Sequence, residues 1–218
     1  MIAVCLLTCN REGYTRRTLE SFLQHNPDAA DRFRLFHADD ASTTSENCAL
    51  AAAAGFETIV RHSRRCGNLA TRIAAIEAAA SVAPWVFVLE NDCESIRPFP
   101  WALFSFVSKN KHIYTLRLFG RFKGAGRREP CRKYNKWTRT RVKWVPLEGA
   151  PEPAELGVVH WTSQPSVTRA KSIVALHRGA RKLGLTARVT RNVLNHFGDI
   201  RTNPLGADRP LQLEGATC

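Results

Sequence analysis

The sequence contains no long apolar run. No stretch approaches the roughly 20 consecutive apolar residues that a membrane-spanning helix needs. The apolar residues 2–7 are too few for a signal peptide, and no basic segment precedes them. We therefore expect a cytoplasmic protein without a transmembrane segment.

Paired cysteine motifs are also missing. The seven cysteines include no C-x-x-C pair, and several of them lie in apolar stretches. An odd number of unpaired cysteines argues against a disulfide framework and against a structural zinc site. We expect reduced thiols in a cytosolic protein.

Acidic residues are scarce in parts of the second half of the chain. Residues 1–108 have a net charge of −2, whereas residues 109–143 carry 13 Lys/Arg and one acid, and residues 169–191 carry seven Lys/Arg and no acid. Aromatic residues and glycines interrupt the basic segment 109–143, which favours loops. Lysine and arginine pair with phosphates and aromatic rings stack on bases, so the pattern suits a polyanion. An acidic glycan, a phospholipid surface or a solvated basic loop are the alternatives.

The candidate nucleic-acid contacts all lie in this basic segment. They are Arg121, Lys123, Arg127, Arg128, Arg132, Lys133 and Lys136.

Apolar runs alternate with helical patterns in the first hundred residues. Strands are predicted over residues 2–8, 33–38, 57–61 and 84–89, and helices over residues 15–24, 46–54 and 69–81. This alternation predicts an α/β fold with a mainly parallel sheet flanked by helices. Further strands are predicted over residues 156–161 and 188–194.

Polar side chains follow three of the predicted strands, at residues 8–11, 39–40 and 90–92. Ligands bind at the carboxyl ends of the strands in such sheets, which gives these clusters a shared location. Glu90 and Asp92 offer two hard oxygen ligands for Mg²⁺ or Mn²⁺, although an acidic turn is the plainer interpretation. Asp39 and Asp40 suit a nucleobase or ribose, or a helix cap. Arg72, near a helix start, suits an anion or a surface ion pair.

Four segments resemble family 2 glycosyltransferases of the GT-A fold. They are LLTCNREGYTRRTLESFLQHN, FHADDAS, RRCGNLATRIAAIEAA and VFVLENDCE, and they occur in the order found in that family. The resemblance implies a GT-A (Rossmann-like) fold and metal-dependent transfer of a sugar, from a UDP-sugar by preference, to a hydroxyl acceptor. Residues 1–108 would bind the nucleotide-sugar, residues 109–143 would be a basic loop-rich insertion, and residues 144–218 would form the acceptor side of the same domain.

The resemblance also implies roles for individual residues. The nucleotide-sugar would contact Thr8, Asn10, Arg11, Asp39, Asp40, Asn68, Arg72 and Asn91. Mn²⁺ or Mg²⁺ would be held by Asp92 and Glu90, with His196 completing the shell. Asp92 would thus serve catalysis together with a carboxylate base, for which Glu155 is preferred over Glu148, Glu152 and Asp199. The sequence Glu-Asn-Asp departs from the family's usual aspartates.

The basic second half bears on the acceptor. The preferred acceptor is DNA carrying a hydroxymethylated pyrimidine, which would make the chain similar to bacteriophage DNA-modifying glycosyltransferases acting in the host cytoplasm. A cell-surface polysaccharide or lipid-linked glycan is the alternative, with peripheral contact to an anionic membrane. A sugar-phosphate nucleotidyltransferase is a further alternative, but residues 8–14 contain only Gly13 where those enzymes have a glycine-rich loop.

Overall fold

The structure, a computed structural model, describes the side chains of residues 1–118, 148–151, 165–175 and 178. Beyond these ranges it describes the backbone of the helices and strands as far as residue 202.

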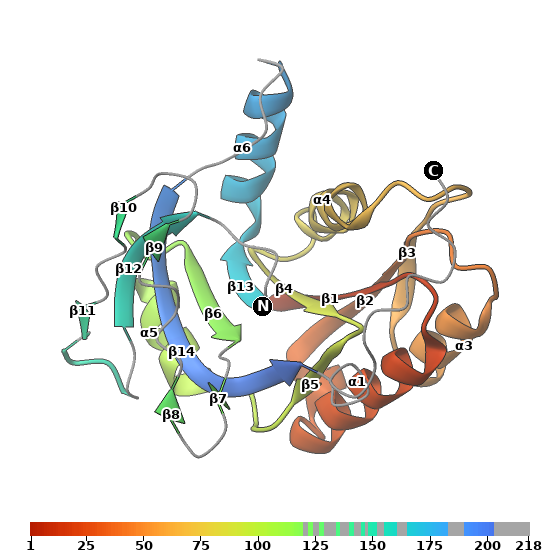
Figure 1. Ribbon diagram of the computed structural model, residues 1–218, viewed down its shortest axis with the longest axis horizontal. Coiled ribbons are helices and arrows are strands. Elements are labelled where there is room, and N and C mark those ends of the chain that lie inside the picture. Colours follow the sequence, from red (N-terminus) through yellow and green to blue (C-terminus); the bar gives the residue numbers. More distant parts are fainter. Residues whose placement is uncertain are drawn as a thin grey trace.

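A ten-stranded sheet forms the centre of the fold (Figure 1), in the order β11-β12-β14-β6-β13-β4-β1-β2-β3, with β5 paired to β14. Its N-terminal part consists of four parallel strands: β1 (Ile2–Thr8), β2 (Phe33–Asp39), β3 (Glu57–Arg61) and β4 (Trp85–Glu90). Thr8 is in register with Asp39, and Leu7 with Glu90. The carboxyl ends of these strands therefore meet at one edge, and the predicted α/β fold is confirmed.

The second part of the sheet is mixed in direction. Strand β13 (Ser166–Arg169) runs antiparallel to β4 and β6 (Thr115–Phe119), while β14 (Thr190–Thr202) runs parallel to β6. Strands β12 (Glu155–His160) and β11 (Val145–Pro146) continue it antiparallel, and β5 (Cys93–Ser95) pairs with the end of β14. Two small ladders join β7 (Phe122–Lys123) to β8 (Arg127–Arg128), and β9 (Tyr134–Asn135) to β10 (Thr140–Arg141).

Helices cover both faces of the sheet (Figure 1). Helices α1 (Glu12–His25), α3 (Glu46–Ala53) and α5 (Trp101–Lys109) pack on one face, and α4 (Asn68–Ala79) and α6 (Ala170–Lys182) on the other. The short α2 (Ala29–Arg32) precedes β2. In β1, Ile2, Val4 and Leu6 face the first layer, while Ala3, Cys5 and Leu7 face the second. Because a strand presents alternate residues to opposite faces, burial on both sides requires the continuous apolar run.

Three boundaries differ from the sequence predictions. Helix α1 begins at Glu12 rather than at residue 15, because the carbonyl of Arg11 already accepts from the amides of Tyr14 and Thr15. Residues 115–119, assigned to a loop-rich segment, form a strand within the sheet, with Leu116 and Leu118 buried in the core. Strand β14 extends eight residues beyond the predicted end at residue 194.

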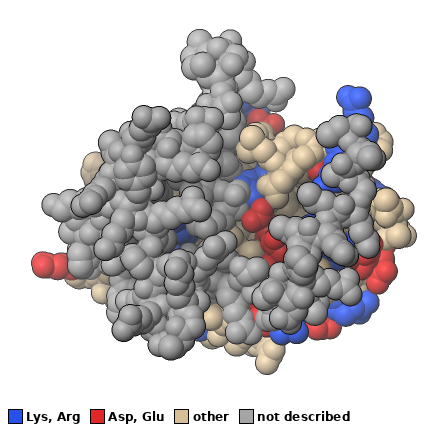
Figure 2. All heavy atoms as spheres, in the orientation of Figure 1, with Lys and Arg blue, Asp and Glu red and all other residues tan. Residues whose placement is uncertain are grey.

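The surface of the described part carries both signs of charge. In Figure 2, acidic and basic side chains lie interspersed along the lower right edge of the molecule. Among the described residues, every helix is too short or too polar to cross a bilayer. The described cysteines, Cys5, Cys9, Cys48, Cys66 and Cys93, are free thiols.

Candidate functional site

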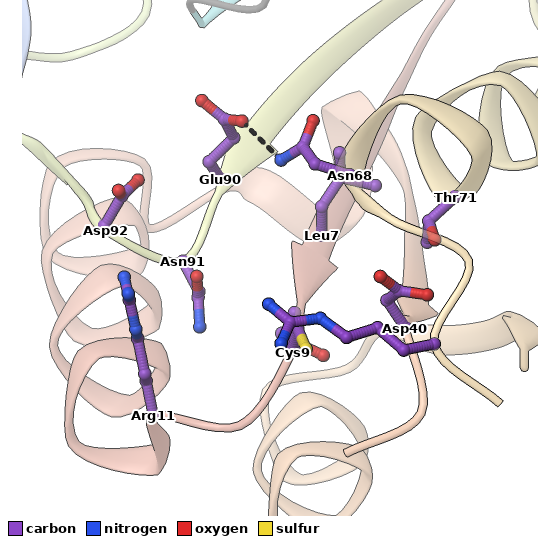
Figure 3. A pocket seen from close by; sticks show the side chains of 11 residues that line it. Leu7, Cys9, Arg11, Asp40, Asn68, Thr71, Glu90, Asn91 and Asp92 are labelled. Atoms are coloured by element: carbon purple, nitrogen blue, oxygen red, sulfur yellow. Dashed lines mark hydrogen bonds between the residues drawn. The ribbon is translucent and has the colours of Figure 1, made fainter. Parts of the chain in front are cut away.

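A pocket opens at the edge where the parallel strands end (Figure 3). Its walls come from the ends of β1, β2 and β4, from the loop after β3 and from the first turn of α4. The lining residues are Leu7, Thr8, Cys9, Arg11, Asp40, Arg65, Asn68, Thr71, Glu90, Asn91 and Asp92. Seven residues assigned from the sequence thus come together: Thr8, Arg11, Asp40, Asn68, Glu90, Asn91 and Asp92.

The loops after β1 and β2 have an unusual backbone. Asn10, Arg11 and Ala41 have φ values of 52°, 61° and 54°, in the left-handed region that non-glycine residues rarely adopt. The two loops hold each other, because the Asn10 amide donates to Ser42 Oγ at 2.8 Å and the Thr43 amide donates to Asn10 Oδ1 at 2.8 Å. Strained backbone of this kind persists only where its surroundings fix it, and it concentrates at functional sites.

Glu90 and Asp92 bring two carboxylates to one side of the pocket. Their oxygens and the Cys93 sulfur all lie within 4.8 Å of one another. Burial raises the pKa of the Cys93 thiol well above its usual value, so this sulfur stays protonated and the carboxylates are the available donors. Two carboxylates with room for phosphate oxygens fit Mg²⁺ or Mn²⁺.

Two side chains of α4 donate hydrogen bonds to Glu90. Its Oε1 accepts from Arg72 Nη2 at 2.5 Å and from Asn68 Nδ2 at 2.8 Å. Burial raises the pKa of Glu90, an effect that the neighbouring Arg72 partly offsets. The negative charge of Glu90 is therefore shared with Arg72, and Asp92 is the stronger candidate ligand.

Arg72, which was expected to face a diphosphate, lies behind the pocket wall. Its side chain is 1% exposed and is not part of the lining. Burial lowers the pKa of Arg72, opposed by the charge of Glu90. Arg65 lines the pocket instead, together with Arg11. The sequence contains a signal for it, because Arg64 and Arg65 directly precede the Cys66-Gly67-Asn68 turn at the start of α4.

Asp39 and Asp40 have different positions. Asp39 is fully buried and accepts bonds from the Thr8 hydroxyl at 2.8 Å and from the Ser42 amide at 2.8 Å. Asp40 lines the pocket, where its two oxygens accept from the amides of Cys66 at 2.7 Å and Gly67 at 2.8 Å. Asp39 therefore supports the loops, whereas Asp40, although only 3% exposed, is part of the pocket wall.

A buried histidine continues this support beneath the pocket. His37 Nε2 lies 2.8 Å from the Thr8 hydroxyl and Nδ1 lies 2.9 Å from the Thr58 hydroxyl. Because Thr8 donates its single proton to Asp39, His37 Nε2 must donate to Thr8. Burial lowers the pKa of His37 from 6.5 to about 4, so the ring is neutral at physiological pH.

Asn10 also stands behind the pocket. Its side chain accepts from Thr43, and its carbonyl accepts from Asn47 Nδ2 at 3.0 Å and Asn91 Nδ2 at 3.2 Å. Asn10 therefore shapes the loop after β1 and is absent from the lining.

The candidates of the second half are described only by their backbone. Glu155 is the first residue of β12 rather than preceding the strand, and it pairs with Asn195. His196 lies inside β14, where the register shifts between Asn195 and Ile200, rather than after a strand ending at residue 194. Glu155 and His196 thus occupy adjacent strands. The end of β14 pairs with β5, which directly follows Asp92.

The structure describes the backbone of only some of the candidate nucleic-acid contacts. Lys123, Arg127 and Arg128 lie in the ladder of β7 and β8. Arg121, Arg132, Lys133 and Lys136 lie outside the described residues.

Residues 3–154 match the family described as Glycosyl transferase family 2. The chain belongs to this family. The membership confirms the resemblance to family 2 glycosyltransferases that the sequence motifs indicate, and it agrees with the pocket at the carboxyl ends of β1, β2 and β4. None of the curated proteins compared with the chain matches it.

Solved structures share the fold of this family 2 chain. It is 14% identical to TarS residues 1–349 of S. aureus, with a TM-score of 0.59, and the match covers 93% of this chain and 60% of TarS 1–349. It is 13% identical to GalNAc-T7, solved with UDP, GalNAc and Mn²⁺, with a TM-score of 0.58 and coverage of 93% and 43%. The chain therefore spans less than two thirds of the length of these structures.

Proposed function

We propose that the chain is a metal-dependent glycosyltransferase that moves a sugar from a nucleotide-sugar, with a UDP-sugar preferred, to a hydroxyl acceptor. The observation that carries this proposal is the meeting of Glu90 and Asp92 with Arg11, Arg65 and Asp40 around one pocket. Carboxylates for a cation and guanidinium groups for phosphates are the two parts that a nucleoside diphosphate requires.

Asp92 would be the main ligand of Mn²⁺ or Mg²⁺, with Glu90 beside it. The cation, when bound, would stabilise negative charge on the departing diphosphate. Two structures of similar fold support a nucleotide donor: TarS 1–349 was solved with UDP, and GalNAc-T7 with UDP, GalNAc and Mn²⁺. We infer a contribution from His196 as well, which lies on the strand that returns to the segment after Asp92.

The remaining groups would act on the donor directly. Arg11 and Arg65 would pair with the phosphates, and Asp40 would accept hydrogen bonds from the nucleoside. Thr8, Asn68 and Asn91 offer further polar contacts on the lining. The reaction breaks the bond from the sugar C1 to the diphosphate oxygen and forms a bond from C1 to the acceptor oxygen. A carboxylate removes the hydroxyl proton, and Glu155 is our candidate for this base.

The proposed acceptor is DNA carrying a hydroxymethylated pyrimidine. The support is the charge of residues 109–143, whose 13 Lys/Arg against one acid suit a phosphate backbone. The contacts proposed from the sequence in this segment run from Arg121 to Lys136.

The donor is tested by a thermal-shift screen of nucleotide-sugars with and without Mn²⁺. We expect one nucleotide-sugar to raise the melting temperature of the wild type only when Mn²⁺ is present, and Asp92→Asn to abolish the shift. A wild type that no nucleotide-sugar stabilises, or an Asp92→Asn variant stabilised equally, would contradict the proposal.

The acceptor is tested separately, by binding to hydroxymethylated duplex DNA and to anionic vesicles over a range of salt concentrations. We expect salt-sensitive DNA binding that Asp92→Asn leaves unchanged, since this residue faces the donor pocket. Absence of DNA binding at low salt would remove DNA as the acceptor, and binding to vesicles alone would favour a membrane-associated glycan.

A further inference from the structure

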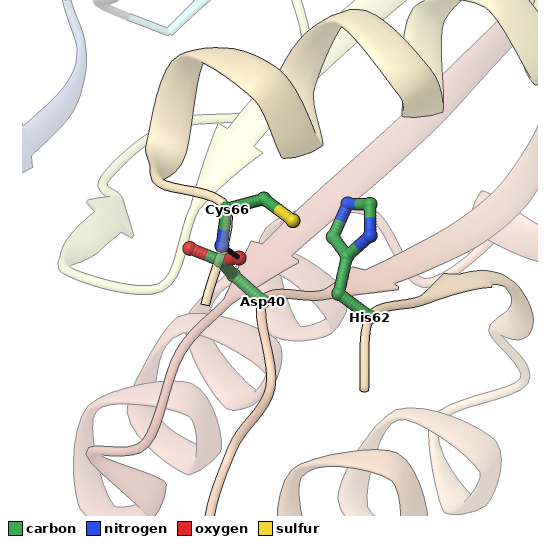
Figure 4. A group of neighbouring side chains, drawn as sticks. All are labelled: Asp40, His62 and Cys66. Carbon is green, nitrogen blue, oxygen red and sulfur yellow. Dashed lines mark hydrogen bonds between the residues drawn. The ribbon is translucent and has the colours of Figure 1, made fainter. Parts of the chain in front are cut away.

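A second group of metal-ligating side chains lies at the Asp40 end of the pocket (Figure 4). Oxygen of Asp40, nitrogen of His62 and sulfur of Cys66 all lie within 4.8 Å of one another. The three residues come from the end of β2 and from the loop between β3 and α4. They are separate from Glu90 and Asp92, which lie at the end of β4 on the other side of β1.

The backbone fixes this group without any bound ion. The His62 amide donates to the carbonyl of Asp39 at 3.0 Å, and the Cys66 amide donates to Asp40 Oδ1 at 2.7 Å. Both ends of the loop are therefore anchored to the end of β2. Each Asp40 oxygen accepts one amide bond and keeps a further lone pair.

His62 supplies an independent indication of a ligand. Its Nε2 atom is buried and has no hydrogen-bond partner within the described part of the chain. A buried polar atom that makes no hydrogen bond destabilises the fold, so such atoms usually have a partner. In Figure 4 the imidazole ring and the Cys66 thiol point toward each other, and a cation between them would satisfy this nitrogen.

We propose that Asp40, His62 and Cys66 bind Zn²⁺. Imidazole nitrogen and thiolate sulfur favour zinc over Mn²⁺ and Mg²⁺, which prefer oxygen. Three protein ligands would leave the fourth tetrahedral position open, and one of the three, Asp40, also lines the pocket. The Cys66 thiol donates to the Arg64 carbonyl at 3.3 Å, and zinc binding would replace this hydrogen bond with a bond from sulfur to the metal.

Zinc at this position uses the Asp40 carboxylate that we assign to the nucleoside. It is therefore expected to weaken nucleotide binding, a consequence that rests on the proposed function. Zinc binding itself does not depend on that function. An experiment can therefore disprove the zinc site without disproving the proposed function, and the reverse.

The experiment titrates the metal-free full chain with Co²⁺, whose bond to a thiolate produces a charge-transfer absorption, and then displaces Co²⁺ with Zn²⁺. We expect the absorption in the wild type, its loss in Cys66→Ser, and weaker binding of both metals in His62→Ala. Loss of a residue that only hydrogen-bonds to a metal ligand lowers metal affinity by roughly 10- to 100-fold. Removal of the ligand itself should lower the affinity by at least as much.

Two controls separate this site from other thiols and carboxylates. Cys48→Ser removes a half-buried cysteine outside the group, and Asp92→Asn alters the other carboxylate cluster. Both variants should keep the absorption, and circular dichroism checks that each variant folds. An absorption that is absent from the wild type, persists in Cys66→Ser, or disappears in Asp92→Asn overturns the proposal.

Discussion

Two strand ends of this molecule each carry two closely spaced acids, and at each end the two acids have different surroundings. At the end of β2, Asp39 is buried among hydrogen-bond donors, while the next residue, Asp40, lines the pocket. At the end of β4, Glu90 is bound to Arg72 and Asn68, while Asp92 offers a carboxylate less occupied by the protein. At both ends the first acid supports the architecture and the later one is available to a ligand. Residue type alone therefore does not assign a role at this edge of the sheet.

The largest effect is expected from Asp92→Asn. Because this substitution removes the main proposed metal ligand, sugar transfer should fall by roughly 100- to 1,000-fold, comparable to losing one electrostatic group at a transition state. Turnover measured against Mn²⁺ concentration checks this. Asp31→Asn, which alters an exposed carboxylate on α2, should leave turnover unchanged. Equal turnover in both variants would mean that the end of β4 holds no catalytic metal.

The hydrogen-bond network of His37, Thr8 and Asp39 beneath the end of β2 should make the stability of the protein sensitive to acid. Its pKa is lowered by burial from 6.5 to about 4, so the unfolded chain binds the proton first as pH falls. The free energy of unfolding should therefore drop between pH 6.5 and pH 4, by about 3 kcal/mol from this residue. Denaturant unfolding of the wild type and of His37→Gln over that range measures the difference.

The matched control for this measurement is His112→Gln, which changes an exposed histidine. It should keep the slope of the wild type, whereas His37→Gln should flatten it. A slope that is the same in all three proteins would show that the network through Thr8 and Asp39 is not coupled to protonation.

Asp39→Asn and Asp40→Asn should separate stability from ligand affinity. Asp39→Asn weakens several buried bonds and should lower the free energy of unfolding by about 1–3 kcal/mol. Asp40→Asn should instead weaken nucleotide binding by roughly tenfold, the value of one good hydrogen bond. Denaturant titration and calorimetric titration of the nucleotide measure the two quantities. A larger loss of nucleotide affinity in Asp39→Asn would reverse our assignment of the pair.

The smallest effect is expected from Glu90→Gln. Its charge is already shared with Arg72, so losing it should raise the Mn²⁺ concentration at half-maximal turnover by about three- to tenfold, less than Asp92→Asn does. Metal titrations of the two variants under identical conditions make the comparison. If Glu90→Gln has the larger effect, Glu90 is the principal ligand.

Much of the N-terminal half could be predicted from the sequence. The strand over residues 57–61 matches β3, and the strands over residues 2–8 and 33–38 match β1 and β2 within one residue. Apolar runs predict these strands because both faces of a parallel sheet are buried. Strand β6 was missed because its basic neighbours dominate the composition of residues 109–143, although Leu116 and Leu118 alternate as a strand requires.

The site could be predicted less completely. The three polar clusters were located correctly at the sheet edge, since the carboxyl ends of parallel strands must meet there. The position of Arg72 behind the wall could not be predicted, because helical spacing does not tell whether an arginine faces a pocket or a neighbouring carboxylate such as Glu90. The sequence also argued against structural zinc on the absence of C-x-x-C, a rule that does not apply to ligands brought together from separate loops, such as His62 and Asp40.

The sequence by itself determined which segments form the parallel strands and that acids, arginines and asparagines follow them. Local apolar periodicity and turn residues suffice for this, because they act over a few neighbouring positions. Only the tertiary structure decided that Asp40 rather than Asp39 lines the pocket, that Arg65 is on its wall, and that Cys66 lies beside His62. Those outcomes depend on hydrogen bonds between segments far apart in the chain, such as those from the amides of Cys66 and Gly67 to Asp40 and from the His62 amide to the Asp39 carbonyl.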